Sequence, residues 1–455
     1  MRDLEIAVLA VCVAALLGAP GCGGDDNDAS SGGDTDSDTD TSWDTEYPCE
    51  SGVVSFADEA LEGAVRETIG KPDGALTSED VSGIEVLYAG ERGIVSLVGI
   101  EALASLKVLV LEWNAIVDIA PLSCLAELEV LDLNVNQISD LAPLAGLTSL
   151  YSLEIHSNEL SDLAPLAGLS PLTILEISGN EVSDLAPLAG LTALSQLMAS
   201  ENQITDVVPL AGLTSLTFLQ LSNNDLTDLT PLAGLVSLCQ LDAEYNEIDT
   251  LPSFADLSSL QTLNLGYNQL SDLTGLEAAI NLDVLNFPSN QVSDLSPIAS
   301  LTTLSSINFD DNEVADLGPL AMLHQATLVS FRGNQVSDLS GASGLEWVET
   351  LLASDNQISD LSPLAGVSSL QEIYFSDNQI ADLSSLEGLV EICSLGLQNN
   401  DITDLAPLVA NLGIDDFDTV SVDENPIDEI AQQTNIQALC DRGVFVIPYC
   451  PGSSD

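Results

Sequence analysis

The sequence predicts an α/β solenoid, in which short parallel strands form one sheet and short helical segments lie on the other side of each coil. Two observations predict it: a strict 22-residue period, and an alternation of leucine with polar residues inside each period. The period is marked by fourteen asparagines at intervals of 22 residues: Asn114, Asn136, Asn158, Asn180, Asn202, Asn224, Asn246, Asn268, Asn290, Asn312, Asn334, Asn356, Asn378 and Asn400. So regular a period indicates one supersecondary unit stacked on itself many times.

Each period begins with a strand and a turn. Before Asn136, Leu131 and Leu133 alternate with Asp132 and Asn134, which is the period of two expected of a strand with one buried face. The asparagine follows where the chain turns away, and its amide can bond backbone groups of its own and neighbouring turns. The pattern Leu-x-x-Leu-x-Leu-x-x-Asn is the signature of a leucine-rich repeat.

A helical segment is expected in the second half of each period. Asp140 precedes Leu141-Ala142-Pro143-Leu144, and a proline in a first helical turn loses no needed N–H. We therefore expect this aspartate to be the N-cap of a short helix. Structural Ca²⁺ along the aspartate column is the alternative, although capping explains the spacing and no cofactor is required. The same column contains Asp118, Asp162, Asp184, Asp206, Asp228, Asp272, Asp294, Asp316, Asp338, Asp360, Asp382 and Asp404, with Thr250 as its one break.

Seven apolar positions in each period point inward. Burying each contributes roughly 1.5–3 kcal/mol, most of which is offset by the ordering of the chain. No period can bury these residues alone, so we expect an arc with one continuous core, a concave parallel sheet, and short 3-10 or α segments on the convex side. In the period around Asn136 the inward residues are Leu128, Leu131, Leu133, Ile138, Leu141, Leu144 and Leu147.

The repeat Asn-Gln-Ile-Ser-Asp-Leu-Ala-Pro-Leu-Ala-Gly-Leu at 136–147 resembles the 22-residue repeats of the bacterial internalins. A second segment is similar to the helical cap that closes the first turn in that family: Phe56-Ala57-Asp58, Leu61-Glu62, Val65-Arg66, Ile69-Gly70-Lys71-Pro72 and Leu76-Thr77. The resemblance covers residues 53–430 and implies a solenoid whose concave face binds a partner protein. It implies no particular partner, because the contact positions vary within the family.

The first 22 residues resemble an export signal. The apolar run from Ile6 to Gly18 is shorter than the roughly 20 residues that span a bilayer. Ala19-Pro20-Gly21-Cys22 resembles a lipobox, the bacterial signal for attaching lipid to a cysteine. We therefore expect a lipoprotein anchored to the bacterial envelope through Cys22, at the outer membrane or cell surface. Plain secretion is the alternative.

The remaining boundaries follow from composition and from the period. Residues 23–50 are rich in Asp, Ser, Thr and Gly and predict a disordered linker. Residues 51–83 are the expected helical N-terminal cap, and residues 84–430 the repeat domain of about 15–16 turns. Residues 431–455 depart from the repeat and are the expected C-terminal cap, since an open strand edge invites pairing with other chains.

The cysteines fall into two groups. Cys440 and Cys450 flank one short segment of the C-terminal cap, and we expect them to form a disulfide in an oxidising envelope. Three others lie too many turns apart to pair, at about 4.8 Å per strand against a Cα–Cα limit of about 7 Å, and are expected to be buried thiols. These are Cys124, Cys239 and Cys393. Cys49 has no obvious partner.

The chain is strongly acidic. It has 72 Asp and Glu residues against seven Lys and Arg, and residues 51–455 hold 60 of the acids and six of the bases, a formal net charge of −54. No basic patch exists for nucleic acid, and anionic lipid would be repelled, so the expected membrane contact is the lipid anchor alone. The charge favours cationic partners, divalent ions or a saline setting.

The outward positions of the concave face hold two candidate ligand-binding groups. In the first, Asp132, Glu154 and Glu176 occupy one column in successive turns, where like charges about 5 Å apart repel unless something compensates them. A basic protein segment would compensate them, with Trp113 as an apolar anchor. A solvated acidic face and a metal held by His156 are the alternatives. The full group is Glu112, Trp113, Asp132, Glu154, His156 and Glu176.

The second candidate group places aromatic rings beside carboxylates, a mixture that suits peptides or sugars. It consists of Asp242, Glu244, Tyr245 and Tyr267. Further along, Asp310 next to Arg332 is expected to be an ordinary cross-strand ion pair.

No enzymatic activity is expected. The two histidines, His156 and His324, lie about seven turns apart with no nucleophile in a triad arrangement, and no phosphate loop, zinc motif or dinucleotide fingerprint is present. The leading hypothesis is a monomeric, envelope-anchored protein that binds a protein or peptide on its acidic concave face. The alternative is a structural or adhesion component that binds calcium or extracellular polysaccharide.

Overall fold

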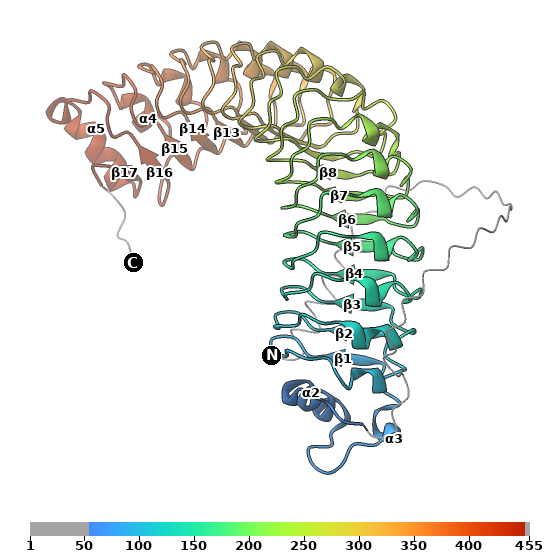
Figure 1. Ribbon diagram of the computed structural model, residues 1–455. Coiled ribbons are helices and arrows are strands. Elements are labelled where there is room, and N and C mark those ends of the chain that lie inside the picture. The colour runs from blue at the N-terminus through green and yellow to red at the C-terminus, as the bar shows by residue number, and fades with distance from the viewer. Residues whose placement is uncertain (1–53, 451–455) are drawn as a thin grey trace. The chain divides into compact units, whose positions relative to one another are not determined.

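The computed structural model describes residues 54–450, which lie within one compact unit. The expected export signal, the lipid-attachment residue Cys22 and the linker at 23–50 lie outside the described residues. Within residues 54–450 the chain winds into a solenoid whose three-residue strands follow one another along the inner side of the curve (Figure 1).

Seventeen strands form one parallel sheet in which each strand pairs with the next along the chain. Equivalent residues of neighbouring turns face each other, as Leu131 and Leu153 do. The strands are β1 (Val86–Tyr88), β2 (Val108–Val110), β3 (Val130–Asp132), β4 (Ser152–Glu154), β5 (Ile174–Glu176), β6 (Gln196–Met198), β7 (Phe218–Gln220), β8 (Gln240–Asp242), β9 (Thr262–Asn264), β10 (Val284–Asn286), β11 (Ser306–Asn308), β12 (Leu328–Ser330), β13 (Thr350–Leu352), β14 (Glu372–Tyr374), β15 (Ser394–Gly396), β16 (Thr419–Ser421) and β17 (Phe445–Ile447).

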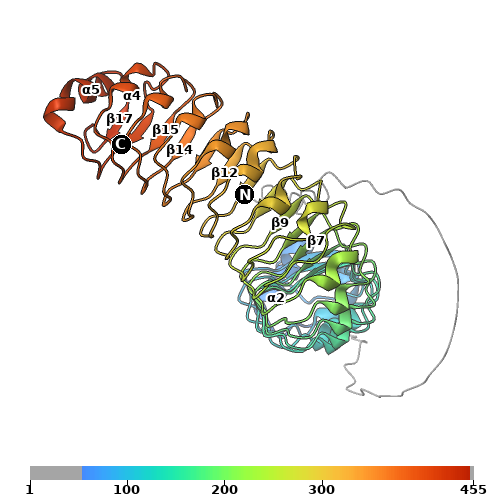
Figure 2. The same ribbon diagram turned by 90° about the horizontal axis from the view of Figure 1, so that it is seen from above.

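Short helices lie on the side of the coil opposite the strands (Figures 1 and 2). Most are 3-10 helices of three to five residues, as expected for the convex side, and the predicted fold class is confirmed. They are η1 (Ile100–Ala102), η2 (Ala120–Cys124), η3 (Ala142–Leu144), η4 (Ala164–Leu166), η5 (Ala186–Leu188), η6 (Val208–Leu210), η7 (Thr230–Gly234), η8 (Leu276–Ala278), η9 (Ser296–Ile298), η10 (Gly318–Met322), η11 (Ser340–Gly344), η12 (Ser362–Leu364) and η13 (Ser384–Leu386), followed by the α-helix α4 (Ala406–Ala410).

The regular spacing of asparagine along the chain is explained by its hydrogen bonds. The Nδ2 of Asn158 donates to the carbonyl of Ile155 in its own turn (3.3 Å) and to that of Leu133 in the previous turn (3.0 Å). Its Oδ1 accepts the N–H of Ile138 at 2.9 Å. Backbone groups that the turn would leave unpaired in the interior are therefore satisfied by one side chain. The ladder continues to Asn425, whose Oδ1 accepts the N–H of Ile402.

The aspartate column caps the convex helices from one residue further back than expected. The Oδ1 of Asp140 accepts the N–H of Ala142 at 2.8 Å, whereas the backbone cap position is Leu141. This is the geometry of an Asx-turn, in which an aspartate bonds the N–H two residues on. All thirteen aspartates of the column make this bond, at 2.7–2.9 Å.

The turn that breaks the column also lacks a convex helix. No helix lies between β8 and β9 in the described chain. The residue two positions after Thr250 is Pro252, which has no N–H to donate, whereas in ten of the thirteen turns with the aspartate a proline stands three positions after it. An aspartate at 250 would therefore have no bond to accept, which accounts for the exception.

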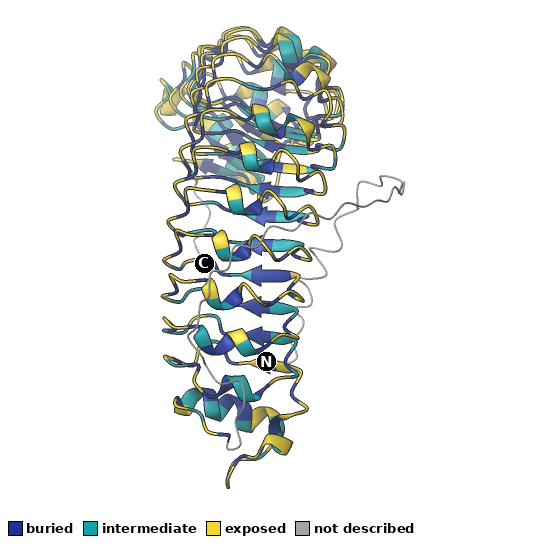
Figure 3. Cartoon of the chain, turned by 45° about the vertical axis from the view of Figure 1, so that its right-hand side comes forward, coloured by how far each residue is buried: buried dark blue, intermediate teal, exposed yellow. Residues whose placement is uncertain are grey.

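The inward positions form one continuous core, visible as the buried interior of the coils in Figure 3. All seven apolar residues of the period around Asn136 are buried. In three successive turns a phenylalanine replaces the second leucine, and the rings of Phe287, Phe309 and Phe331 stack with centroid separations of 5.9 and 5.7 Å. Stacking of these rings stabilises the core beyond the effect of burying their apolar surface.

The first turn is closed by α2 (Glu59–Ile69) and α3 (Ser78–Val81). Asp58 caps α2 by accepting the N–H groups of Ala60 and Leu61, and its second oxygen accepts the N–H of Val95 at 2.9 Å, which ties the helix to the first turn. A capping box formed by Thr77 and Asp80 opens α3.

At the other end, α5 (Glu429–Asp441) packs near α4, and β17 adds one more strand to the sheet. Arg442 donates to the carbonyls of Val409, Asn411 and Ile414. The polar groups of the last coil are thereby paired, and a helix stands beside the final strand.

Cys440 and Cys450 form a disulfide, with their Cα atoms 6.0 Å apart. The expectation of buried thiols is wrong for the other three cysteines. Cys124 and Cys239 each belong to a disulfide and are partly exposed. Cys393 is a free, exposed thiol. Cys239 and Cys393 stand immediately before a strand, in a column that elsewhere holds polar residues such as Glu129. That column lies at the edge of the coil rather than inside it.

Asp162→Ala should lower the free energy of unfolding by about 1 kcal/mol, because it removes the bond to the N–H of Ala164 that begins η4. Thr250→Ala, the same truncation in the turn without a cap, should leave stability unchanged. Chemical denaturation of the two variants measures both values. Equal losses in the two turns would show that the aspartates do not act as caps.

Candidate functional site

The sheet register brings the first group of predicted residues together at one end of the concave face. Asp132 lies opposite Glu154, and Glu154 opposite Glu176, on the adjacent strands β3, β4 and β5. We call the group Asp132, Glu154, Glu176, Glu112 and His156 the acidic surface. Parallel neighbouring strands are about 4.8 Å apart, so these carboxylates are direct neighbours.

Asn134 connects the acidic surface, and it was not among the predicted residues. Its N–H donates to Asp132 Oδ1 at 2.9 Å, and its Nδ2 donates to Glu154 Oε2 at 3.3 Å. Its Oδ1 accepts the N–H of His156 at 2.8 Å. The signal in the sequence was an asparagine at an outward position, two residues after Asp132, where most other turns carry serine or a charged residue.

Burial changes the proton affinity of these groups. Asp132 is only 6% exposed, and burial, aided by the neighbouring Glu154, Glu112 and Glu176, raises its pKa from 3.8 to about 7. Burial also raises the pKa of Glu154, with Glu176 adding to the effect, and raises that of Glu176. Burial lowers the pKa of His156 against the opposing influence of Glu154.

No described cation neutralises these carboxylates, because each lysine and arginine of residues 54–450 bonds elsewhere. Five make ion pairs: Arg66 with Glu62, Lys71 with Asp80, Arg92 with Glu67, Lys107 with Glu85, and Arg332 with Asp310. The sixth, Arg442, donates to carbonyls of the last turns. No lysine or arginine of residues 54–450 therefore neutralises the acidic surface.

Exposed apolar side chains border the acidic surface on its N-terminal side. Trp113, one of the predicted residues, is 60% exposed, and Tyr88 on β1 is 50% exposed with Val86 beside it on the same strand. Tyr88 and Val86 were not predicted, because the first turn has Arg92 in place of the ladder asparagine that marks the outward positions. Together these three residues form an apolar rim next to the carboxylates.

The second group of predicted residues also comes together, on β8, β9 and the turns that follow them. The rings of Tyr245 and Tyr267 stack with centroids 4.1 Å apart and an interplanar angle of 7°. Asp242 Oδ1 accepts from Ser222 Oγ and from the N–H of Glu244. Burial and the charge of Asp242 raise the pKa of Glu244.

The described part of the chain offers little for metal binding or catalysis. Within residues 54–450 no group of three or more His, Cys, Asp or Glu side chains is arranged to hold a metal ion. His324 is bonded to the carbonyl of Gly344 at 2.9 Å, far along the chain from His156. Among the same residues no helix is long and apolar enough to cross a membrane.

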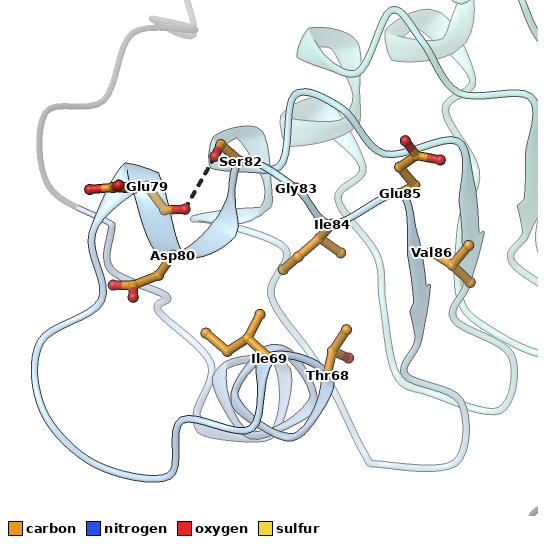
Figure 4. Close-up of a pocket in the computed structure, with 9 residues that line it drawn as sticks. All are labelled: Thr68, Ile69, Glu79, Asp80, Ser82, Gly83, Ile84, Glu85 and Val86. Carbon is orange, nitrogen blue, oxygen red and sulfur yellow. Dashed lines mark hydrogen bonds between the residues drawn. The ribbon is translucent and has the colours of Figure 1, made fainter.

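A hollow of about 650 Å³ lies at the N-terminal cap, where α2, α3 and β1 supply lining residues (Figure 4), and Val86 belongs both to its lining and to the apolar rim. Ile69 of α2, Ile84 and Val86 form its apolar wall. Its polar groups are engaged locally: Ser82 Oγ donates to the carbonyl of Glu79, and Asp80 belongs to the capping box. The hollow brings no catalytic set together.

Asp132→Asn should stabilise the protein above pH 7 and have little effect near pH 4. A carboxyl whose pKa rises from 3.8 to about 7 on folding contributes stability below pH 4 that is lost as the pH rises through 7. The upper bound on the stabilisation by Asp132→Asn is roughly 4 kcal/mol. Asparagine keeps an oxygen for the N–H of Asn134. Urea denaturation at pH 5 and pH 8 measures the difference.

Asp225→Asn, at an exposed position, is the matched control for the loss of one negative charge. A gain at pH 8 that the control variant reproduces would contradict the raised pKa of Asp132.

Family models of leucine-rich repeats match parts of the chain. A two-copy repeat model matches residues 126–168 and 192–234, and a second leucine-rich repeat model matches residues 214–270. No curated protein sequence matches the chain.

Solved structures resemble most of the chain. An internalin, InlF, from Listeria monocytogenes is 28% identical over 82% of this chain and 95% of its own, with a TM-score of 0.59. A leucine-rich repeat protein from Leptospira interrogans is 23% identical over 81% of this chain and 97% of its own, with a TM-score of 0.74.

A more distant similarity is to the plant peptide hormone receptor RGFR1, solved in complex with RGF2. It is 18% identical over 77% of this chain and 60% of its own, with a TM-score of 0.64. Together with the asparagine ladder and the parallel sheet, these matches show that the chain has a leucine-rich repeat fold with structural similarity to the bacterial internalins.

Proposed function

We propose that this protein binds a protein or peptide with a basic surface, and that the acidic surface on β2 to β5 is where it docks. One observation carries the proposal: Asp132, Glu154 and Glu176 lie side by side in register, without a described cation to neutralise them. Keeping like charges together costs stability. Such a cost is tolerated where the charges serve a ligand.

The electrostatics define the partner. A lysine or arginine brought against these carboxylates would favour their ionised form, and binding would release protons near neutral pH because the pKa of Asp132 is about 7 in the unbound protein. The net charge of −54 for residues 51–455 would attract a basic partner from a distance, so association should slow as salt rises.

The apolar rim supplies the second half of the recognition. Trp113, Tyr88 and Val86 are exposed beside the carboxylates, and large aromatic residues are frequent anchors in protein interfaces. A partner with an apolar side chain next to its basic residues would cover both features. Leucine-rich repeat proteins generally mediate protein–protein interactions, and the plant receptor similar in fold is in complex with RGF2.

Calcium binding is the weaker function for this chain. Each aspartate of the convex column already gives an oxygen to a backbone N–H, and residues 54–450 contain no group arranged to hold a metal.

Replacing Glu154 and Glu176 together by glutamine should weaken binding of lysine- and arginine-rich peptides by at least about tenfold, and should flatten its dependence on salt. The matched control is the double variant of Glu159 and Glu181 to glutamine, which removes the same charge from exposed positions of the same two turns. A library of basic peptides, measured by fluorescence anisotropy at low and high salt, provides the readout. The proposal fails if no peptide binds, or if both double variants behave alike.

We also propose that the protein is held at the bacterial envelope by lipid on Cys22, with residues 23–50 as the spacer. Cys22→Ser should move the protein from the membrane fraction to the soluble or secreted fraction and abolish labelling by a radioactive fatty acid. Cys49→Ser should change neither. A Cys22→Ser variant that stays membrane-bound and labelled would exclude this anchor.

A further inference from the structure

A second surface on the concave face has a chemistry different from that of the acidic surface. It lies on β8 to β11, at least three strands beyond β5, which is roughly 14 Å along the sheet. Five side chains define it, and we call them the aromatic–amide platform: Tyr245, Tyr267, Asn264, Asn286 and Asn308.

The two tyrosines occupy a column that rarely accepts bulky residues. They precede the ladder asparagine and have left-handed backbone, with φ of 53° and 56°. Most turns place Asn, Asp, Ser, Glu or Gly there, since side chains other than glycine, asparagine and aspartate are disfavoured in this conformation. Tyr245 and Tyr267 are 46% and 45% exposed and stacked face to face. The concave face thus carries a broad apolar plate that the core does not use.

The three asparagines stand in one column at the ends of β9, β10 and β11, in register with one another. Asn286 Nδ2 donates to Asn264 Oδ1 at 2.9 Å, and Asn308 Oδ1 accepts the N–H of Asp310 at 2.9 Å. The Nδ2 groups of Asn264 and Asn308 and the Oδ1 of Asn286 have no hydrogen-bond partner among residues 54–450. The row therefore offers fixed donors and an acceptor to a ligand.

Two carboxylates beside the platform, Asp242 and Asp310, are occupied by internal contacts. Asp310 accepts from Ser330 Oγ at 2.6 Å and from the N–H and Nε of Arg332 at 2.7 and 2.9 Å. Asp242 accepts from Ser222 Oγ and the N–H of Glu244. Because Asp242 and Asp310 are already bonded, the groups left for a ligand are the neutral amides, the aromatic rings and the carboxyl of Glu244, whose pKa is raised by burial and by the charge of Asp242.

Gly266, which lies between Asn264 and Tyr267 in the chain, stands where a side chain would collide with its neighbours. A Cβ on Gly266 would lie 2.9 Å from the ring of Pro288 and 3.1 Å from Glu244 Oε1. A side chain at this position would therefore displace the Pro288 ring, so glycine keeps the turns next to the tyrosines and the asparagines in place.

We propose that the aromatic–amide platform binds a neutral saccharide. The apolar face of a sugar ring would lie on the tyrosine pair, and its hydroxyls would bond the amides of Asn264, Asn286 and Asn308. Hydroxyls both donate and accept, as amides do, which matches the unused groups of the row. A rigid aromatic surface with a few placed polar groups is the usual composition of a small-ligand site.

A basic peptide fits this surface less well than it fits the acidic surface. Its cationic groups would find Asp242 and Asp310 already bonded, and the uncharged asparagines would give no ion pair. The two surfaces therefore differ in ligand class, and binding at one does not depend on binding at the other.

The test is isothermal titration of the full chain with a panel of neutral tetrasaccharides, comprising β-1,4- and α-1,4-linked glucose, β-1,4-linked N-acetylglucosamine and α-linked mannose. We expect at least one to bind with a Kd below about 1 mM. Tyr267→Ala and Asn286→Ala should each weaken that binding by about tenfold or more, and Tyr267→Phe should retain most of it. Tyr151→Ala, which removes an equally exposed tyrosine outside the platform, should have no effect.

Tyr151 and Tyr267 are exposed, so their alanine variants should melt at the wild-type temperature, which a thermal scan verifies. The double variant of Glu154 and Glu176 to glutamine should bind the saccharide as the wild type does, so the two proposals can fail separately. No binding by any saccharide of the panel would overturn the proposal, as would equal losses in Tyr267→Ala and Tyr151→Ala. The proposal would also be overturned if only basic peptides bound and Tyr267→Ala abolished that binding, because the platform would then be a peptide site.

Discussion

The pairing of backbone groups by one asparagine in each turn is the constraint on which the solenoid depends. A coil of 22 residues bends the chain back on itself inside the protein, where its N–H and C=O groups have no water to bond. Asn202 illustrates the solution: its Nδ2 reaches the carbonyls of Ile177 and Ala199, and its Oδ1 accepts the N–H of Val182. An unpaired buried polar group costs about 1–3 kcal/mol, so the residue is fixed in turn after turn.

This constraint leaves the outward positions of the strands free to vary. The leucines that alternate with them are buried and the backbone is held from both sides, so an outward residue can change without moving the sheet. The acidic surface and the aromatic–amide platform share one column of the repeat, four residues before the ladder asparagine, and are separated by a few strands. A scaffold of fixed register can therefore present unrelated chemistries side by side, with geometry supplied by the turns and specificity by single residues.

Much of the fold could be predicted because it depends on local periodicity. The strand column, the inward leucines, the asparagine ladder and the neighbourhood of Asp132, Glu154 and Glu176 all follow from a spacing of 22. What the spacing does not contain is how one side chain covers another. The hub role of Asn134, the deep burial of Asp132 and the stacking of Phe287, Phe309 and Phe331 depend on pairs of neighbours in space.

Two errors have the same origin. The aspartate cap lies one residue earlier than expected because an Asx-turn, rather than the helix's own first residue, makes the bond. Two of the cysteines expected to be buried, Cys239 and Cys393, stand at the edge of the coil, in a column whose polar occupants in other turns already indicated exposure. In both cases the repeat predicted the right column, and the local geometry of that column decided what its residues do.

The distribution of cations explains why no lysine or arginine of residues 54–450 neutralises the acidic surface. Arg66, Lys71 and Arg92 bond groups at the N-terminal cap, and Arg442 bonds the last coils. Both ends of a solenoid expose groups that no neighbouring turn can pair, so most of the few basic residues serve there. The middle of the concave face keeps only Arg332, held by Asp310. Neutralisation of Asp132, Glu154 and Glu176 must then come from protons or from a partner, which couples their protonation to binding.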